Sequence, residues 1–223
     1  MKTNLFQTQD ELNEALMHQF SVWINESIAQ YDQVNILLSG GSTPQKFYAL
    51  LSEQDLPWHK ILFGLVDERY VLQSNKHSNE SMIRGAMSSI SDQLSLVTMV
   101  VDVEHQHINL MDVNKHYKPF IERVDIALLG MGTDGHTASI FPGDPRSEEL
   151  LTSNALGIFY TTSPQAPHVR LTCSPATLAK SRHGVILLHG EEKSRIFNLN
   201  RLNPLPIDRF KELSNFEHYI SMI

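Results

Sequence analysis

Short apolar runs alternate with helical segments along this chain, and no other feature restricts its fold as strongly. We expect strands over residues 34–39, 61–66, 96–101, 124–129, 156–161, 168–173 and 184–188. Strands that alternate with helices are typical of a mostly parallel sheet with helices on both faces. The predicted fold is therefore α/β and Rossmann-like, and a length of 223 residues favours a single domain over residues 1–223.

The helices between these strands have local signals of their own. Thr8 and Glu11 have the spacing of a capping box, which predicts a helix over residues 9–30. This segment carries one apolar stripe, formed by Leu12, Leu16, Phe20, Trp23, Ile24 and Ile28. Pro44 suits the first turn of a helix over residues 45–51. Further helices are expected over residues 79–87, 108–122 and 190–200, and a surface loop over residues 142–147.

Composition and charge argue against nucleic acids and membranes as partners. The chain has 18 Lys and Arg against 25 Asp and Glu, a formal charge of −7, and no dense basic run. No stretch approaches the roughly 18 apolar residues of a membrane span, and the first residues lack the apolar core of a signal peptide. We expect a cytoplasmic enzyme, monomeric or weakly homo-oligomeric. An anionic small molecule is compatible with this charge, because a few local cations can outweigh the global sign.

Residues that commonly bind metals do not form a recognisable set. The single cysteine, Cys173, excludes an intrachain disulfide and a cysteine-based zinc cluster, and its strand context indicates a small buried side chain. His105 and His107 alternate, but no acid or cysteine completes a zinc set around them. We therefore expect neither a metal nor another cofactor.

The segment GMGTDGHTASIFPG, residues 130–143, is the strongest candidate for a site. It follows the expected strand 124–129, and open α/β sheets bind ligands at the carboxyl ends of their strands. Glycines at 130, 132 and 135 allow the backbone to bend and to approach a ligand closely. His136 is placed to accept a proton, since an imidazole is mostly neutral at neutral pH. Asp134 is a candidate to orient it, although loop residues two apart need not face each other.

A second glycine-rich segment, SGGSTP at residues 39–44, joins an expected strand to a helix. Gly40 and Gly41 allow free backbone N–H groups to converge where the helix dipole favours an anion. Ser42 and Thr43 add hydroxyl donors. The same residues also suit a tight turn with a capped helix, so both interpretations stay open. The segment is neither a Walker A motif nor a GxGxxG motif, which weakens a nucleotide-binding interpretation.

The segment DER, residues 67–69, follows another expected strand. Arg69 at such a position can bind phosphate or carboxylate through two parallel hydrogen bonds. The alternative is a surface ion pair, Asp67 with Arg69 or Glu68 with Arg84, which stabilises a protein very little. The polar residues 77–81 either line the same cleft or cap the next helix.

Arg170 and Lys193 are two further candidate cations. Taken separately, each is more simply a solvated surface charge. Both lie on or after late strands whose carboxyl ends are expected to open on the same cleft. Together with residues 39–44, they would give one anion-binding pocket three sources of positive potential.

The order of these motifs resembles that of the 6-phosphogluconolactonase family, within the wider glucosamine-6-phosphate isomerase/6-phosphogluconolactonase family. The motifs are SGGSTP, DER with a downstream NES, GMGTDGHTASIFPG, SPQAPHVRLTCSPATLAKS and GEEKSR, and the match covers nearly the whole chain. The resemblance implies a NagB/RpiA/CoA-transferase-like fold, with His136 as the catalytic base. It also implies that Arg69, Arg170 and Lys193 contact substrate and phosphate. The substrate-binding candidates are then Gly40, Gly41, Ser42, Thr43, Asp67, Gly130, Gly132, Arg170 and Lys193.

The implied reaction is hydrolysis of 6-phospho-D-glucono-1,5-lactone to 6-phosphogluconate in the oxidative pentose phosphate pathway. His136 would take a proton from water and then protonate the leaving ring oxygen, with Asp134 as its orienting partner. Backbone N–H groups around residues 130–132, or Arg69, are candidates to stabilise the developing oxyanion. The phosphate would be held by Ser42, Thr43, Arg170 and Lys193.

Two alternatives stay open at this point. A glucosamine-6-phosphate deaminase shares similar loops, but its pattern resembles DEY where this chain has DER, and DGHIAFNEPG where it has DGHTASIFPG. Both differences favour the lactonase. The second alternative is a sugar-phosphate sensor that binds without turnover. The segment CSPATLAKS, residues 173–181, departs from the family's more apolar pattern and affects packing more than chemistry.

Overall fold

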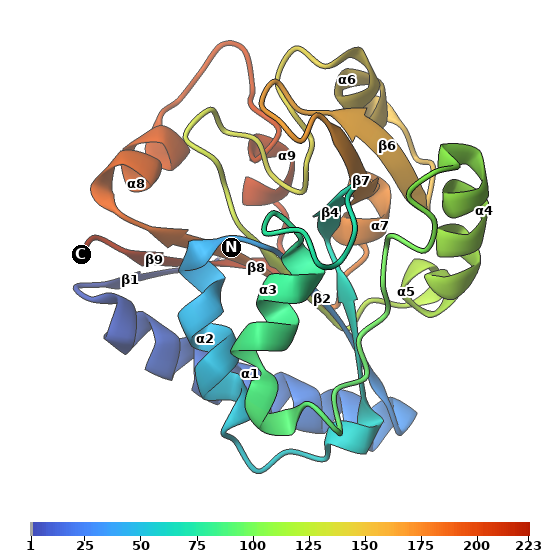
Figure 1. Cartoon of the computed structure of the whole chain (residues 1–223). Helices are drawn as coiled ribbons and strands as arrows, with labels where there is room; N and C mark the ends of the chain where they lie inside the picture. Colours follow the sequence, from blue (N-terminus) through green and yellow to red (C-terminus); the bar gives the residue numbers. More distant parts are fainter. Residues whose placement is uncertain (1) are drawn as a thin grey trace.

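The computed structural model describes residues 2–223 and contains a six-stranded parallel sheet with helices on both faces (Figure 1). The strand order is β1-β9-β8-β5-β2-β3. The bounds are β1 Lys2–Phe6, β2 Val34–Leu38, β3 Ile61–Leu65, β5 Ile126–Leu129, β8 His183–His189 and β9 Phe216–Ser221. The predicted α/β architecture is confirmed.

The helices divide between the two faces of this sheet. In Figure 1, α1 and α2 lie below the sheet, and α8 and α9 lie above it. The helices on the side of α1 are α1 Gln9–Tyr31, α2 Ser42–Ser52 and α3 Asn79–Ala86. The remaining helices are α4 Gln106–His116, α5 Lys118–Glu122, α6 Pro145–Thr152, α7 Pro175–Ala179, α8 Glu191–Asn198 and α9 Asp208–Lys211, with short 3₁₀ turns at Trp58–Lys60 and Ser88–Ile90.

The central strands and α1 form for the reasons that the sequence indicates. All residues of β2 and β5 are buried, as expected of strands covered on both faces. At the start of α1, the Thr8 side chain accepts a hydrogen bond from the Glu11 backbone, and the Glu11 carboxylate accepts one from the Thr8 backbone. This capping box satisfies two N–H groups that a helix start leaves unpaired. The predicted helix start is therefore confirmed.

Three strands form a separate antiparallel sheet instead of extending the parallel one. They are β4 Asp67–Arg69, β7 Val169–Cys173 and β6 Ile158–Thr162, in that spatial order. The expectation that residues 156–161 and 168–173 belong to the parallel sheet is therefore wrong. Only residues 163–168 connect β6 to β7, whereas a parallel pair needs a crossover of a dozen residues or more. A hairpin is the only pairing that this connection allows.

Other predicted elements differ from the structure in smaller ways. Residues 96–101 form a single bridge, Phe63 to Leu96, and not a strand. The helix expected over residues 108–122 is divided into α4 and α5, because Pro119 lacks an N–H and occupies the first turn of the second helix. The expected loop at residues 142–147 already contains the start of α6, which Asp144 caps. β1 and β9 were not predicted.

The order of the parallel strands explains where the two glycine-rich segments meet. From β2 the chain moves outward to β3, whereas from β5 it moves in the opposite direction to β8. The carboxyl ends of β2 and β5 are neighbours at this topological switch point. Open α/β sheets bind ligands in the crevice at such a point. Residues 39–44 and 130–143 leave the sheet on the two sides of that crevice.

Candidate active site

Two adjoining hollows occupy this crevice. The first hollow, of about 240 Å³, is lined by residues 39–44, Asn79, the start of the 130–143 loop and Lys193. The second hollow, of about 450 Å³, is lined by His77, residues 163–167 and Arg170. Five residues line both hollows and so mark their junction: Asp67, Arg69, Gly132, His136 and Ser139.

His136 and Asp134 form a hydrogen-bonded pair at this junction. His136 Nδ1 lies 2.5 Å from Asp134 Oδ1, which also accepts from the His136 backbone N–H at 3.1 Å. The hydrogen bond from His136 lowers the pKa of Asp134. A Cβ at Gly132 would lie 2.2 Å from the His136 ring, so only glycine permits this packing. With Nδ1 bonded to a carboxylate, Nε2 is the ring nitrogen that can accept a proton.

The groups that line the first hollow are suited to an anion. α2 begins at Ser42, directly after Gly41, whose φ of +105° favours glycine, and no side chain caps this helix end. The N–H groups of the first turn, with Ser42 and Thr43, therefore border the hollow without a capping group. Burial lowers the pKa of Lys193, which forms no ion pair within residues 2–223. A cation beside a helix N-terminus is a favourable site for phosphate.

Gly40 completes this hollow through its contact with α3. A Cβ at Gly40 would lie 1.9 Å from Oδ1 of Asn79, so a larger residue would displace that amide. Asn79 also donates from Nδ2 to the carbonyl oxygen of Asp67 at 2.9 Å. Of the residues 77–81, Ser78 caps α3 and Asn79 lines the first hollow. Both interpretations of this segment therefore apply, to different residues.

Two arginines lie side by side at the second hollow. Arg69 and Arg170 are directly opposite each other on β4 and β7. Arg170 is only 6% exposed, and its Nη1 has no hydrogen-bond partner among residues 2–223. Burial and, second, the charge of Arg69 lower the pKa of Arg170 to about 10. An unpaired buried guanidinium N–H is costly, which favours an anionic or carbonyl oxygen of a ligand here.

The site departs from the sequence-based expectation in where Arg170 lies. The prediction of one pocket formed jointly by residues 39–44, Arg170 and Lys193 requires correction, since Arg170 lines the second hollow and the others line the first. The physical reason is that β7 belongs to the antiparallel sheet and does not end at the carboxyl edge of the parallel one. The remaining predicted residues, including Gly130 and Gly132, line the first hollow, except Asp134, which lines the second.

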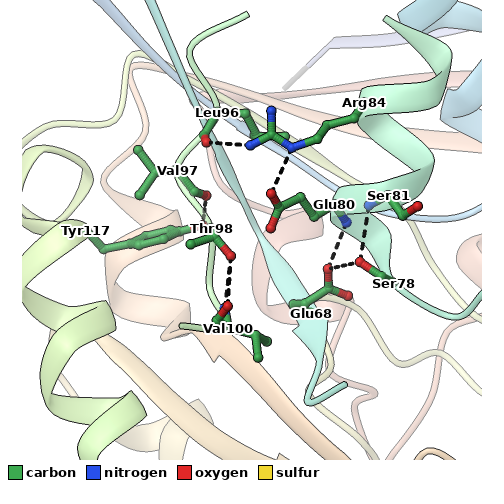
Figure 2. A network of polar contacts seen from close by, with 10 residues as sticks. All are labelled: Glu68, Ser78, Glu80, Ser81, Arg84, Leu96, Val97, Thr98, Val100 and Tyr117. Carbon is green, nitrogen blue, oxygen red and sulfur yellow. Dashed lines mark hydrogen bonds and ion pairs between the residues drawn. The ribbon is translucent and has the colours of Figure 1, made fainter. Parts of the chain in front are cut away.

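A buried carboxylate anchors α3 and the DER segment beneath the site. Glu68 accepts hydrogen bonds from the backbone N–H groups of Arg69, Asn79 and Glu80, each at 2.7 Å, and from the Ser78 hydroxyl at 3.1 Å. Figure 2 shows Glu68 below the first turn of α3. Glu68 therefore forms no pair with Arg84, contrary to one sequence-based alternative.

The same figure shows how α3 contacts the segment that contains Leu96. Arg84 Nε donates to Glu80 at 2.8 Å, and its Nη2 donates to the carbonyl oxygen of Leu96 at 3.1 Å (Figure 2). The Tyr117 hydroxyl lies 3.2 Å from the carbonyl oxygen of Val97 and also accepts from the backbone of β3. The Arg84 contact with Leu96 holds the last turn of α3, while the first turn of that helix faces the site.

Replacing Glu68 with glutamine should lower the free energy of unfolding by about 1–3 kcal/mol, because the amide NH₂ would face buried donors that lose their acceptor. Burial raises the pKa of Glu68. The folded state therefore holds the proton of the Glu68 carboxyl more tightly than the unfolded state does. The stability that Glu68 gives to the wild type then falls as the pH rises through its folded-state pKa. The difference in the free energy of unfolding between Glu68→Gln and the wild type should become smaller as the pH rises over that range.

Urea unfolding at several pH values measures this effect. Glu53→Gln, at an exposed glutamate after α2, is the matched control and should change the free energy of unfolding by less than about 0.5 kcal/mol. A Glu68→Gln protein as stable as the wild type at every pH measured would contradict the anchoring role.

Several site residues have no clear signal in the sequence. Ser139 lies at the junction of the hollows, and residues 163–167 line the second hollow as the connection of the hairpin. Ser139 belongs to the glycine-rich segment 130–143 but was not singled out within it, and residues 163–167 carry no charged side chain. Only the recognition of β6 and β7 as a hairpin, through their short connection, would have placed residues 163–167 beside the site.

The comparisons with known proteins show the family to which the chain belongs. A family model described as glucosamine-6-phosphate isomerases/6-phosphogluconolactonase matches residues 7–214. The chain belongs to this family. A 6-phosphogluconolactonase from Helicobacter pylori is 30% identical over 191 residues, which cover 84% of this chain and 81% of the relative. One from Neisseria meningitidis is 32% identical over 170 residues, which cover 73% and 72%.

Solved structures of the 6-phosphogluconolactonase family share the same fold. The structure of a 6-phosphogluconolactonase from Shewanella baltica has a TM-score of 0.89 and 26% identity, and the match covers 100% of this chain and 97% of that one. One from Trypanosoma brucei has a TM-score of 0.78 and 26% identity, over 99% and 95%. The family, the fold and the enzyme class expected from the sequence are thereby confirmed.

Within residues 2–223, no group of three or more His, Cys, Asp or Glu side chains is arranged to hold a metal ion. No helix over the same residues has the length and apolar character needed to cross a membrane.

Proposed function

We propose that this protein hydrolyses 6-phospho-D-glucono-1,5-lactone to 6-phosphogluconate. The observation that carries the proposal is the position of the His136–Asp134 pair, between a hollow suited to phosphate and a hollow that contains two arginines. The names of the family relatives support the same substrate. A lactone is already electrophilic, so hydrolysis needs an activated water and a fixed substrate, and no covalent nucleophile.

His136 is the proposed general base. Its Nδ1 is bonded to Asp134, and Nε2 takes a proton from the water that attacks the lactone carbonyl carbon. The resulting imidazolium is stabilised by the Asp134 carboxylate. It then returns the proton to the ring oxygen as the C–O bond breaks. One imidazole thus acts first as base and then as acid.

The phosphate is proposed to bind in the first hollow. The uncapped start of α2, with the hydroxyls of Ser42 and Thr43, supplies donors, and Lys193 supplies a charge. Gly40, Gly41, Gly130 and Gly132 keep the backbone close to the ligand. Holding the phosphate there fixes the lactone relative to His136, and such orientation lowers the barrier by making the attack effectively intramolecular.

Arg69 and Arg170 are proposed to act on the lactone end. Negative charge develops on the carbonyl oxygen during attack, and positioned donors that are stronger for the transition state accelerate the step. Arg69 lines both hollows and donates from Nη1 to the carbonyl oxygen of His77 at 2.6 Å, which fixes its direction. The Asp67 carboxylate offsets part of the charge of Arg170.

The reaction is proposed to serve the oxidative pentose phosphate pathway, with the whole chain acting as one domain. The expectations of a cytoplasmic location and of a monomer or weak homo-oligomer stay predictions.

An assay of the purified protein tests the proposal. The rate of lactone loss, with the spontaneous rate subtracted, should exceed the background by several orders of magnitude. Release of ammonia from glucosamine 6-phosphate without lactone hydrolysis would replace the proposal with the deaminase alternative. Tight binding of 6-phosphogluconate with no turnover of either substrate would favour the sensor.

A further inference from the structure

Two residues close to His136 have a backbone conformation that their side chains disfavour. Ala138 and Ser139 both have a φ of +51°, in the left-handed region that L-residues of these types rarely adopt. Both are buried, at 6% and 3% exposure. Such a conformation persists only where the surrounding structure holds it.

Each strand of the antiparallel sheet contributes one side chain that holds this segment. From β7, the Thr172 hydroxyl contacts the carbonyl oxygen of Ala138. From β6, the Thr161 hydroxyl donates to the carbonyl oxygen of Ser139 at 2.7 Å. From β4, Asp67 accepts a hydrogen bond from the Ser139 hydroxyl. Thr161 and Thr172 are 3% and 0% exposed, so water does not compete for these bonds.

The holding side chains share one face of the sheet with the two arginines. Asp67 is opposite Thr172, and Arg69, two residues further on, is opposite Arg170. Thr161 is opposite Arg170 on the other side. Residues two apart on a strand lie on the same face. The sheet therefore connects the arginines at the second hollow to the backbone that follows the proposed base.

We propose that Thr161 and Thr172 are positioning residues for the hydrolysis. They act through Ala138 and Ser139 to hold the His136 ring at a fixed position relative to the two arginines. Neither threonine lines either hollow, so neither contacts the ligand directly. The Thr172 hydroxyl also lies 2.9 Å from the carbonyl oxygen of Cys173, which keeps it within the sheet. The proposal rests on the proposed hydrolase function.

Valine substitutions test the role of the hydroxyls, because valine has nearly the shape of threonine. Thr172→Val and Thr161→Val should lower kcat by about 10- to 100-fold, with KM within about threefold of the wild-type value, since small misplacements of reacting groups have effects of this size. Thr172→Ser, which keeps the hydroxyl, should retain most of the wild-type kcat. Thr177→Val is the matched control, because Thr177 is equally buried and bonded to the backbone, but on α7 away from the hollows. It should keep the wild-type kcat per folded molecule.

A second measurement separates this proposal from the proposed function. The ¹⁵N and ¹H resonances of the His136 imidazole report its hydrogen bond to Asp134 whether or not the lactone is the substrate. They should shift or broaden in both valine variants and stay unchanged in Thr177→Val. If the wild type fails to hydrolyse the lactone, the proposed function fails, and the imidazole resonances still test the positioning role. Wild-type kcat and resonances in both valine variants, or an equal loss in the Thr177→Val control, would overturn the proposal.

Discussion

Replacing His136 with alanine is expected to reduce lactone hydrolysis to near the spontaneous rate. A positioned general base accelerates such a step by about 10²- to 10⁴-fold, and no second imidazole among residues 2–223 lies at the junction of the two hollows. The measurement is the initial rate of 6-phospho-D-glucono-1,5-lactone loss at saturating substrate, after subtraction of the uncatalysed rate.

Two further variants sharpen this prediction. His116→Ala, at an exposed position in the last turn of α4, removes an imidazole away from the site and should leave the rate unchanged. Asp134→Asn should give an intermediate loss of kcat, because the amide no longer stabilises the imidazolium that forms during attack. A His136→Ala protein with a rate within about threefold of wild type would remove His136 from the mechanism.

Replacing Lys193 with methionine is expected to raise KM by about 10- to 100-fold. A hydrogen bond to a charged group contributes about 1.5–3 kcal/mol, and each 1.4 kcal/mol is tenfold in affinity. Methionine keeps much of the side-chain bulk and removes only the charge and its donors. Burial already lowers the pKa of Lys193, so an anion beside it would gain from an ammonium group that is poorly solvated.

The unphosphorylated lactone is the internal control for this prediction. Lys193→Met should lose most of the preference for the 6-phosphorylated lactone over D-glucono-1,5-lactone, whose own rate should change little. Lys115→Met, at an exposed lysine paired with Asp112 on α4, is the matched control and should leave both rates as in the wild type. An unchanged KM and an unchanged preference in Lys193→Met would place the phosphate elsewhere, with Arg170 in the second hollow as the next residue to replace.

Much of the parallel sheet and of the site was predictable from local sequence. The buried runs of β2 and β5 are continuous and apolar, and a glycine-rich segment follows each of them. The capping box before α1 and Pro44 in the first turn of α2 acted as expected. These signals are reliable because they depend on residues only a few positions apart, whose sterics and hydrogen bonds hardly depend on the rest of the chain.

The edge strands and the antiparallel sheet were not predictable in the same way. β1 is short and mostly exposed, so it lacks a buried apolar run. β4 is a three-residue strand of charged residues, and it is a strand only because β7 pairs with it. Strand pairing depends on partners about a hundred residues apart, and no local pattern encodes the choice between them.

The sequence by itself determined that this chain is an α/β protein of a recognisable family, with His136 in a loop at the carboxyl end of a buried strand. It also indicated which cations to consider, because arginine and lysine beside glycine-rich turns suit anionic ligands. Only the tertiary structure decided that Arg170 faces Arg69 at the second hollow and that Lys193 lies at the first. It alone showed that Asp134 bonds to His136 and that Thr161 and Thr172 hold the loop that follows. Composition and local periodicity are set by neighbours along the chain, whereas a site of this kind depends on which distant strands lie side by side.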